Sequence, residues 1–188
     1  MSHVLTTGQT AKVMRVSQQT VIRLADGGTL QNFRVPGSKF RRIFASSIEK
    51  IMLAQSMWYE GAGSVLYPHL LLVTTNDALE AQTKELLQGK SFKIVRACTA
   101  IEAGHKLIET RPHVALIDEN TLPSVSEQAV EKMKLHDVEV FSTKDGSFSC
   151  HSVSAREPCS RVRHLKDFLE VAEEAAFSIW RERLSRMN

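Results

Sequence analysis

The chain of 188 residues is 43% apolar and 24% charged, a composition typical of soluble globular proteins and sufficient for one large domain or two small ones. No apolar run is long enough to span a bilayer and no charged-then-apolar leader opens the sequence, so we expect a cytoplasmic protein without membrane contact. The three cysteines form no CxxC pair, which argues against a disulfide framework and favours reduced thiols.

Charge is unevenly distributed along the chain. Residues 1–60 hold eight Lys/Arg against three Asp/Glu, a net charge of +5, whereas residues 61–188 hold sixteen against eighteen, a net charge of −2. Residues 28–48 contain no acidic side chain at all. A solvated surface usually interleaves both signs, so this segregation indicates a nucleic-acid partner for the first third of the chain.

The first fifty residues predict two short helices joined by a tight turn. The pattern Thr6-x-x-Gln9 is a capping box for the first helix, and Ser17 is a suitable N-cap for the second. Gly27-Gly28 ends the second helix, because glycine readily takes the left-handed conformation that follows many helices. The exposed Gln, Thr and Arg side chains of such a helix can meet base edges in a major groove.

A basic hairpin and a third helix follow. Pro36-Gly37-Ser38 predicts a turn between two short strands whose Arg and Lys side chains can hold phosphates, and Ser46-x-x-Glu49 predicts the cap of the third helix. Residues 56–68 break the helical pattern with two glycines and a proline. We therefore expect a first domain over 1–55, a linker over 56–68 and a second domain over 69–188.

The second domain alternates between two periodicities. Apolar runs predict strands over 70–73, 92–95, 114–117 and 138–141, with a weaker strand near 149–153. Helical patterns lie between them over 77–88, 99–110 and 124–135, and in the second of these helices Ile101, Leu107 and Ile108 are expected to face inward. This alternation predicts a doubly wound parallel α/β sheet.

A long helix over about 160–186 ends the chain. Its apolar stripe exceeds what a sheet with a missing fourth helix is expected to cover, so part of the stripe should face a second chain or another protein. The expected association surface consists of Leu165, Phe168, Leu169, Ala172, Ala176 and Ile179.

The order of helix, turn and basic hairpin within residues 4–54 is carried by Leu5-Thr6-Thr7, Ala11, Val16-Ser17, Thr20-Val21, Gly27-Gly28, Phe33-Arg34-Val35, the run from Lys39 to Ile43, and the helix from Ser46 to Met52. In these residues the segment resembles the excisionase-type branch of the MerR superfamily. The resemblance implies a small α+β winged helix-turn-helix that binds double-stranded DNA. It implies major-groove contacts from Ser17, Gln18, Gln19, Thr20 and Arg23. It implies wing contacts, to phosphate or in the minor groove, from Arg34, Lys39, Arg41 and Arg42.

A second resemblance is carried by the run from Arg111 to Pro123, in which Asp118 ends the third predicted strand. In this run the chain from residue 69 onward resembles a response-regulator receiver, a flavodoxin-like α/β domain, with Asp118 at the phospho-acceptor position. Receivers follow their first strand with an acidic pair that binds Mg²⁺, whereas these positions are Thr74 and Thr75, which supply too little ligand charge. The stretch 144–148 is too short for the usual fourth helix, and the hydroxyl expected after the fourth strand is Ser142 or Thr143. The resemblance therefore implies a pseudo-receiver whose degenerate site comprises Asp118, Thr74, Thr75 and Thr143.

Neither catalysis nor a cofactor is expected, because no nucleophile–base arrangement or phosphate loop occurs in the sequence. The spacing of Cys150, His151, Cys159 and His164 matches no common zinc-finger pattern, so no metal site is expected either. The expected function is a bacterial, nucleoid-associated transcription regulator that associates with itself or with a protein partner through its C-terminal domain. Two alternatives remain open: a protein-binding adaptor or scaffold without DNA binding, and a true response regulator phosphorylated at Asp118.

Overall fold

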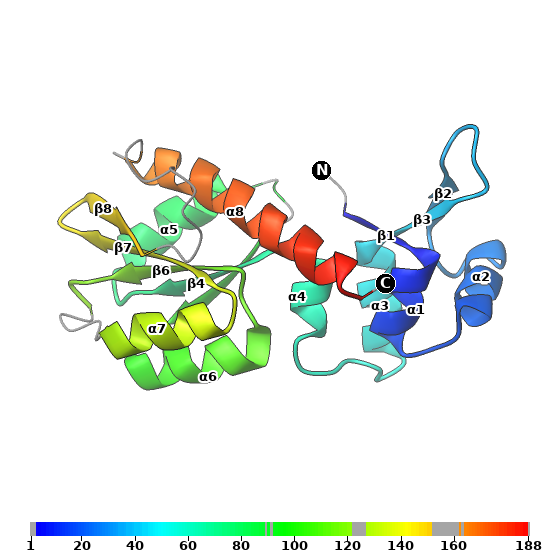
Figure 1. The fold of residues 1–188 in the computed structure, drawn as a ribbon, viewed down its shortest axis with the longest axis horizontal. Helices are drawn as coiled ribbons and strands as arrows, with labels where there is room; N and C mark the ends of the chain where they lie inside the picture. The colour runs from blue at the N-terminus through cyan, green and yellow to red at the C-terminus, as the bar shows by residue number, and fades with distance from the viewer. Residues whose placement is uncertain are drawn as a thin grey trace.

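The computed structural model describes residues 3–88, 90, 92–121, 127–151, 162 and 164–187. It contains a three-stranded antiparallel sheet near the N-terminus and a five-stranded sheet in the rest of the chain (Figure 1). Within the described residues, no helix combines the length and the hydropathy that crossing a bilayer requires.

The N-terminal elements are β1 (Val4–Thr6), α1 (Thr7–Met14), α2 (Gln18–Asp26), β2 (Asn32–Arg34), β3 (Arg41–Phe44), α3 (Ala45–Ala54) and α4 (Ala62–Leu66). The predicted capping box of α1 is confirmed, since the Thr6 hydroxyl accepts from the Gln9 amide and the Gln9 side chain accepts from the Thr6 amide. The Ser17 cap of α2 is confirmed as well. The predicted cap of α3 is wrong, because α3 begins at Ala45 without a side-chain cap and the nearby Ser47 hydroxyl instead accepts from the Gln31 amide.

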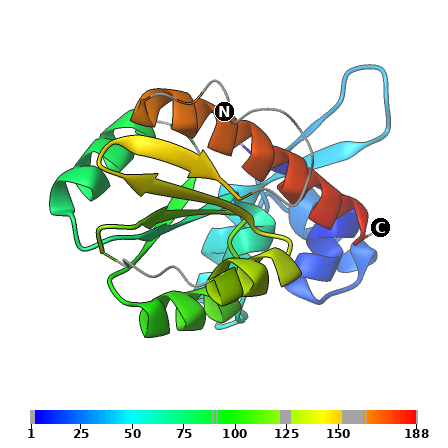
Figure 2. The ribbon, with the colours of Figure 1, turned by 60° about the vertical axis from the view of Figure 1, so that its left-hand side comes forward.

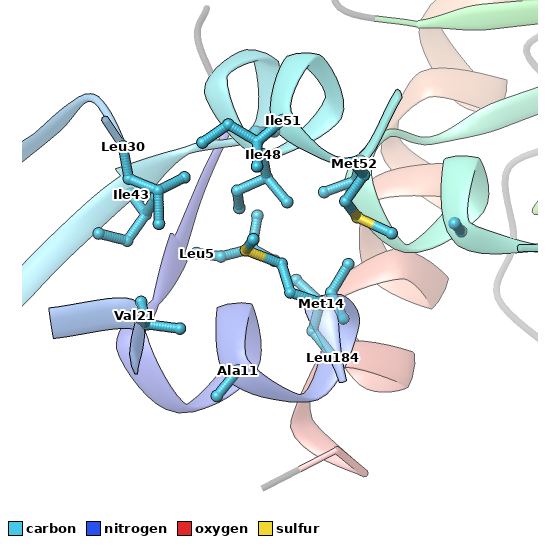
Figure 3. Packing of buried hydrophobic residues seen from close by; sticks show 14 of the residues in the cluster. Leu5, Ala11, Met14, Val21, Leu30, Ile43, Ile48, Ile51, Met52 and Leu184 are labelled. Carbon is cyan, nitrogen blue, oxygen red and sulfur yellow. The ribbon is translucent and has the colours of Figure 1, made fainter. Parts of the chain in front are cut away.

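The first hydrophobic core gathers side chains from α1, α2 and α3 and from the small sheet (Figure 3). Leu5, Met14, Ile43 and Met52 are all at most 1% exposed in it. We call this cluster the N-terminal core. The segment expected to be a linker contributes to it, since α4 packs on α3 and its Leu66 is fully buried.

The remaining elements are β4 (His69–Val73), α5 (Asp77–Leu86), β5 (Lys93–Ala97), α6 (Ala100–Thr110), β6 (Val114–Asp118), α7 (Glu127–Leu135), β7 (Glu139–Lys144), β8 (Ser147–Cys150) and α8 (Leu165–Ser185). The strand order is β5-β4-β6-β7-β8, and the first four strands are parallel. Helices α6 and α7 cover one face and α5 and α8 the other (Figures 1 and 2). The α/β prediction is confirmed, and the sheet is compatible with a flavodoxin-like domain.

The fifth strand departs from the predicted parallel sheet. Strand β8 pairs with β7 antiparallel, with Lys144 opposite Ser147. Only Asp145 and Gly146 join the two strands, and both have positive φ, of 49° and 81°. A parallel connection needs a dozen or more residues, whereas a two-residue turn of this conformation closes a hairpin. Because no helix connects β7 to β8, the last strand of the sheet runs antiparallel to its neighbour.

Helix α6 presents a different face to the sheet than predicted. Ala103 and Leu107 are buried against the sheet, whereas Ile101 is 88% and Ile108 61% exposed. Two residues seven apart lie almost in line along a helix, and this line falls roughly opposite the one through Ala103 and Leu107. The expected inward orientation of Ile101 and Ile108 is therefore wrong.

Helix α8 spans both hydrophobic cores. Its first half buries Phe168, Leu169, Ala172 and Ala176 against the sheet, and Leu165 and Ile179 are half-buried. These residues were expected to form the association surface, but the four buried ones are covered by the chain itself. They are therefore closed to a partner in this conformation.

The second half of α8 enters the N-terminal core with Trp180 and Leu184. The Trp180 indole donates to the Val65 carbonyl over 2.9 Å. One turn later, Arg183 donates to four carbonyl oxygens, those of Arg111, Pro112, His136 and Asp137, over 2.8–3.2 Å. Helix α8 thus fixes the N-terminal core to the loops that precede β6 and β7.

Candidate nucleic-acid interface

The turn between α1 and α2 sets the crossing of the two helices. Arg15 ends α1 in the left-handed conformation with φ of 54°, and its amide donates to the carbonyls of Ala11 and Lys12. Its guanidinium carbon lies 4.0 Å from the centre of the Tyr59 ring. This cation–π contact helps to stabilise the left-handed conformation of Arg15, which is unfavourable for residues other than glycine.

Helix α2 exposes a polar face at its N-terminal end. Ser17, Gln18, Gln19 and Arg23 are exposed, whereas Val21 and Ala25 are buried on the opposite side. Helix α2 and the β2–β3 hairpin lie together at the end of the molecule farthest from the five-stranded sheet (Figure 1). The polar face is therefore open to a large ligand.

Two of the α2 residues are partly engaged within the chain. The half-buried Thr20 hydroxyl lies 2.9 Å from that of Ser17. The Gln18 amide folds back over Gly8, where its nitrogen lies 2.9 Å from the place that a Cβ on residue 8 would take. Gln19 and Arg23 are thus the long side chains of this face that point most freely away from the protein.

The hairpin turn has the predicted chemistry. The Ser38 amide donates to the Val35 carbonyl over 3.0 Å, with Pro36 and Gly37 at the two central positions. Gly37 has φ of 75°, which a type II turn requires at its third residue. The hairpin therefore projects its tip well clear of the N-terminal core (Figure 2).

Two polar contacts fix the hairpin to the C-terminal end of α2. The Asn32 side-chain amide donates to the Ala25 carbonyl over 3.0 Å. The Arg41 guanidinium lies 2.5 Å from the Asp26 carboxylate, and the Arg41 side chain is only 12% exposed. Arg41, which was expected to contact DNA from the wing, forms an ion pair with Asp26 and helps to orient the hairpin.

The other basic side chains of the hairpin divide between its two faces. Arg34 is exposed and lies opposite Arg41 in the strand register, on the face toward α2. Arg42 is half-buried and lies opposite Phe33, on the other face. Lys39 is exposed beside the turn. The structure thus brings Arg34 close to α2 and keeps Lys39 and Arg42 on the tip and the outer face.

Sequence reasoning missed the residues that position this interface and the aromatic residues on it. Asp26 and Asn32 orient the hairpin, but their partners are fifteen and seven residues away, and no local pattern marks such pairs. Phe33 and Phe40 are 42% and 70% exposed. Their signal was visible in the sequence, as two aromatic residues that interrupt an otherwise basic hairpin.

The degenerate phospho-acceptor site lies at the carboxyl end of the sheet. The Thr74 hydroxyl donates to Asp118 Oδ2 over 2.7 Å, and the Asn120 amide donates to Oδ1 over 3.1 Å. The Thr121 hydroxyl lies 3.3 Å from Oδ2, and Thr75 contacts Thr121 through its amide and its hydroxyl. Asp118 is 4% exposed, so these groups enclose its carboxylate.

This constellation does not fit the Mg²⁺ ion that the receiver resemblance implies. The hydroxyl of Thr74 stands at a position where a receiver has an acid, and it binds the acceptor carboxylate directly. Thr143 lies beside Asp118 in the strand register and is 7% exposed. The neighbouring Glu119 carboxylate accepts from the Ser142 hydroxyl over 2.6 Å. At the two positions where a receiver has its acidic pair, the structure thus offers hydroxyl groups where Mg²⁺ needs charged oxygens, and the Glu119 carboxylate is engaged by Ser142.

The cysteines and histidines were considered above as a zinc site. Cys159 lies outside the described residues, and the part of the chain that the structure describes holds no cluster of three or more metal-ligating side chains. Cys98 is a free thiol, as expected. Cys150 forms a disulfide bond, so the expectation of reduced thiols is wrong for this residue.

Comparison of the chain with protein-family models, with curated proteins and with solved structures finds no match.

Proposed function

We propose that this protein is a DNA-binding transcription regulator. The observation that carries the proposal is the exposed polar end of α2, which lies beside a projecting hairpin in a stretch without acidic residues. In this arrangement the N-terminal region acts as a winged helix-turn-helix, with α2 in the major groove and the β2–β3 hairpin as its wing. Gln19 and Arg23 contact base edges, and Arg34, Lys39 and Arg42 contact phosphates.

The rest of the chain mediates protein association without phosphorylation. One winged helix buries only about 600–1,000 Å² on DNA, so a second copy bound alongside raises affinity and specificity. Helices α6 and α7 offer large aliphatic side chains for such a contact, since Ile101, Ile108 and Leu135 are 88%, 61% and 83% exposed. Association through this face, with a second copy or a protein partner, replaces association through α8. The site of action in this proposal is the nucleoid of a bacterial cytoplasm.

Selection from random duplex DNA, followed by salt titration of the recovered sequence, tests the proposal. The full chain is used because the N-terminal core includes Trp180 and Leu184 of α8. For phosphate contacts from Arg34, Lys39 and Arg42, log affinity should fall against log salt with a slope of roughly −2.7, about −0.9 per contact. Replacing Arg34, Lys39 or Arg42 by Ala should reduce that slope by about 0.9 each and weaken binding to all sequences alike.

Gln19→Ala and Arg23→Ala should instead reduce preference at particular base pairs, by about 1–3 kcal/mol each. Lys132→Ala, an exposed charge on α7, serves as the matched control and should leave the slope unchanged. Sedimentation of the complex gives the number of chains per duplex. If the selection yields no preferred DNA sequence and the protein does not bind duplex DNA at low salt, the proposal is contradicted and the protein-binding adaptor is favoured.

The alternative is a response regulator that is switched by phosphorylation of Asp118. The hydrogen bonds around the Asp118 carboxylate argue against it. Acetyl phosphate with Mg²⁺ should add no phosphate to the protein, as intact-mass measurement shows, because hydrogen bonds from Thr74 and Asn120 occupy the carboxylate. Asp118→Asn should leave DNA affinity unchanged while lowering the free energy of unfolding by about 1–3 kcal/mol, since one of its accepting oxygens becomes a donor. A mass increase of one phosphate that disappears in Asp118→Asn would establish a true response regulator.

A further inference from the structure

Phe40 is the most exposed aromatic residue of the hairpin. It follows Lys39 directly after the turn, and 70% of its surface is open to solvent. Phe33, by comparison, is 42% exposed and its ring lies 5.6 Å from that of Phe44. The Phe40 amide donates to the Ser38 hydroxyl over 3.2 Å and its carbonyl accepts from the Val35 amide over 3.0 Å, so residue 40 lies directly after the turn. The hairpin that carries this large apolar ring projects from the rest of the molecule (Figure 2).

The charges around Phe40 restrict the partner that can cover it. Lys39 precedes it, Arg34 and Arg42 flank the same hairpin, and residues 28–48 hold no acidic side chain. Removing an apolar ring from water beside unpaired cations requires a partner that offers both negative charge and an apolar interior. Duplex DNA has this combination, with phosphates outside and stacked bases inside.

Two polar contacts also join the hairpin to α2. The Asp26–Arg41 ion pair and the bond from Asn32 to Ala25 fix both strands to α2. Helix α2 and the hairpin lie together at one end of the molecule, so a duplex that receives α2 in its major groove also meets the hairpin (Figure 1). Side chains that kink DNA act from the minor groove.

We infer that Phe40 inserts between two stacked base pairs in the minor groove and kinks the duplex. The inference rests on the proposed function and adds a mode of binding to it. Flexible pyrimidine–purine steps would be the preferred sites, because they unstack most easily. Phe40 therefore contributes sequence preference without hydrogen bonds to bases.

The test uses the selected duplex in two labelled forms and the full chain. One form carries a fluorescent adenine analogue next to each pyrimidine–purine step in turn, and its emission rises when the base unstacks. The other carries a donor and an acceptor dye at its ends, and their energy transfer reports a kink, expected at about 20–90°. Phe40→Ala should remove both signals and weaken binding about three- to tenfold, the range expected for one buried aromatic ring offset by unstacking.

Phe40→Leu should retain much of the kink, because leucine also serves as an apolar wedge. Phe33→Ala is the matched control, an aromatic residue of the same hairpin away from its tip, and should leave the kink in place. Binding by the wild-type chain without unstacking, or an unchanged kink in Phe40→Ala, would overturn this inference and leave the proposed function standing, with Phe40 then assigned to a protein contact. Absence of any binding by the wild-type chain would overturn both.

Discussion

Trp180→Ala is expected to lower the free energy of unfolding by about 3–5 kcal/mol and to abolish DNA binding, although Trp180 lies far from the proposed interface in sequence. The residue is 7% exposed, packs 5.0 Å from the His3 ring and donates to the Val65 carbonyl. Truncation removes the buried ring and leaves that carbonyl without its partner. Because whole domains are stable by only about 5–15 kcal/mol, this loss is large enough to unfold the N-terminal region near physiological temperature.

Chemical denaturation followed by circular dichroism measures the effect without relying on the fluorescence of the deleted indole. Trp180→Phe keeps most of the apolar ring and loses the hydrogen bond, so it should cost about 1–2 kcal/mol and retain DNA binding. Arg181→Ala, on the exposed side of the same helix, should change neither property. If Trp180→Ala has the stability and affinity of the wild type, then α8 does not support the N-terminal core.

The role of α8 could not be predicted from its sequence, although its existence and extent could. A stripe of apolar residues shows that one face is covered, but it does not show by what. The stripe contained the residues that pack on the sheet, whereas Trp180 and Leu184, one and two turns beyond Ala176, enter a core formed more than a hundred residues earlier. Such a contact depends on where the chain returns in space, which no local periodicity encodes.

Elements with strong local signals were predicted well. Buried parallel strands and capped helices follow from short runs of residues, and both the Thr6 and the Ser17 caps were confirmed. The antiparallel direction of β8 also follows from local sequence, because a two-residue connection cannot make a parallel crossover. The last strand was instead expected to be parallel, like the strands before it. At the candidate interface, the set of basic residues was visible in the sequence. Only the structure shows that Arg41 is paired with Asp26 and that Thr74 binds Asp118.

Acidification is expected to destabilise the protein between pH 6.5 and about 4, through two buried histidines at the base of the sheet. Burial lowers the pKa of His69 to about 4 against the effect of its bond to the Tyr67 carbonyl, and the charge of Lys93 lowers this pKa further. Burial also lowers the pKa of His113 well below its usual value, with Arg183 acting in the same direction. The His69 amide donates to His113 Nδ1 over 3.0 Å, so the folded state needs His113 neutral at that nitrogen.

In the unfolded chain both imidazoles bind protons below about pH 6.5. In the folded state the pKa of His69 is about 4, and burial also holds the pKa of His113 well below its usual value, so both rings stay neutral while the unfolded chain is already protonated. The free energy of unfolding is therefore highest above pH 6.5 and decreases as pH falls. For His69 alone, the decrease is about 2 kcal/mol at pH 5 and about 3 kcal/mol at pH 4. Urea titrations at a series of pH values measure this slope. The variant His69→Asn/His113→Asn keeps a donor and an acceptor near the two Nδ1 positions but cannot titrate, so its stability should vary less over the same range. His105→Asn, whose imidazole is 76% exposed on α6, should retain the wild-type slope. An equal slope in all three proteins would show that other groups, such as carboxylates, control the acid response.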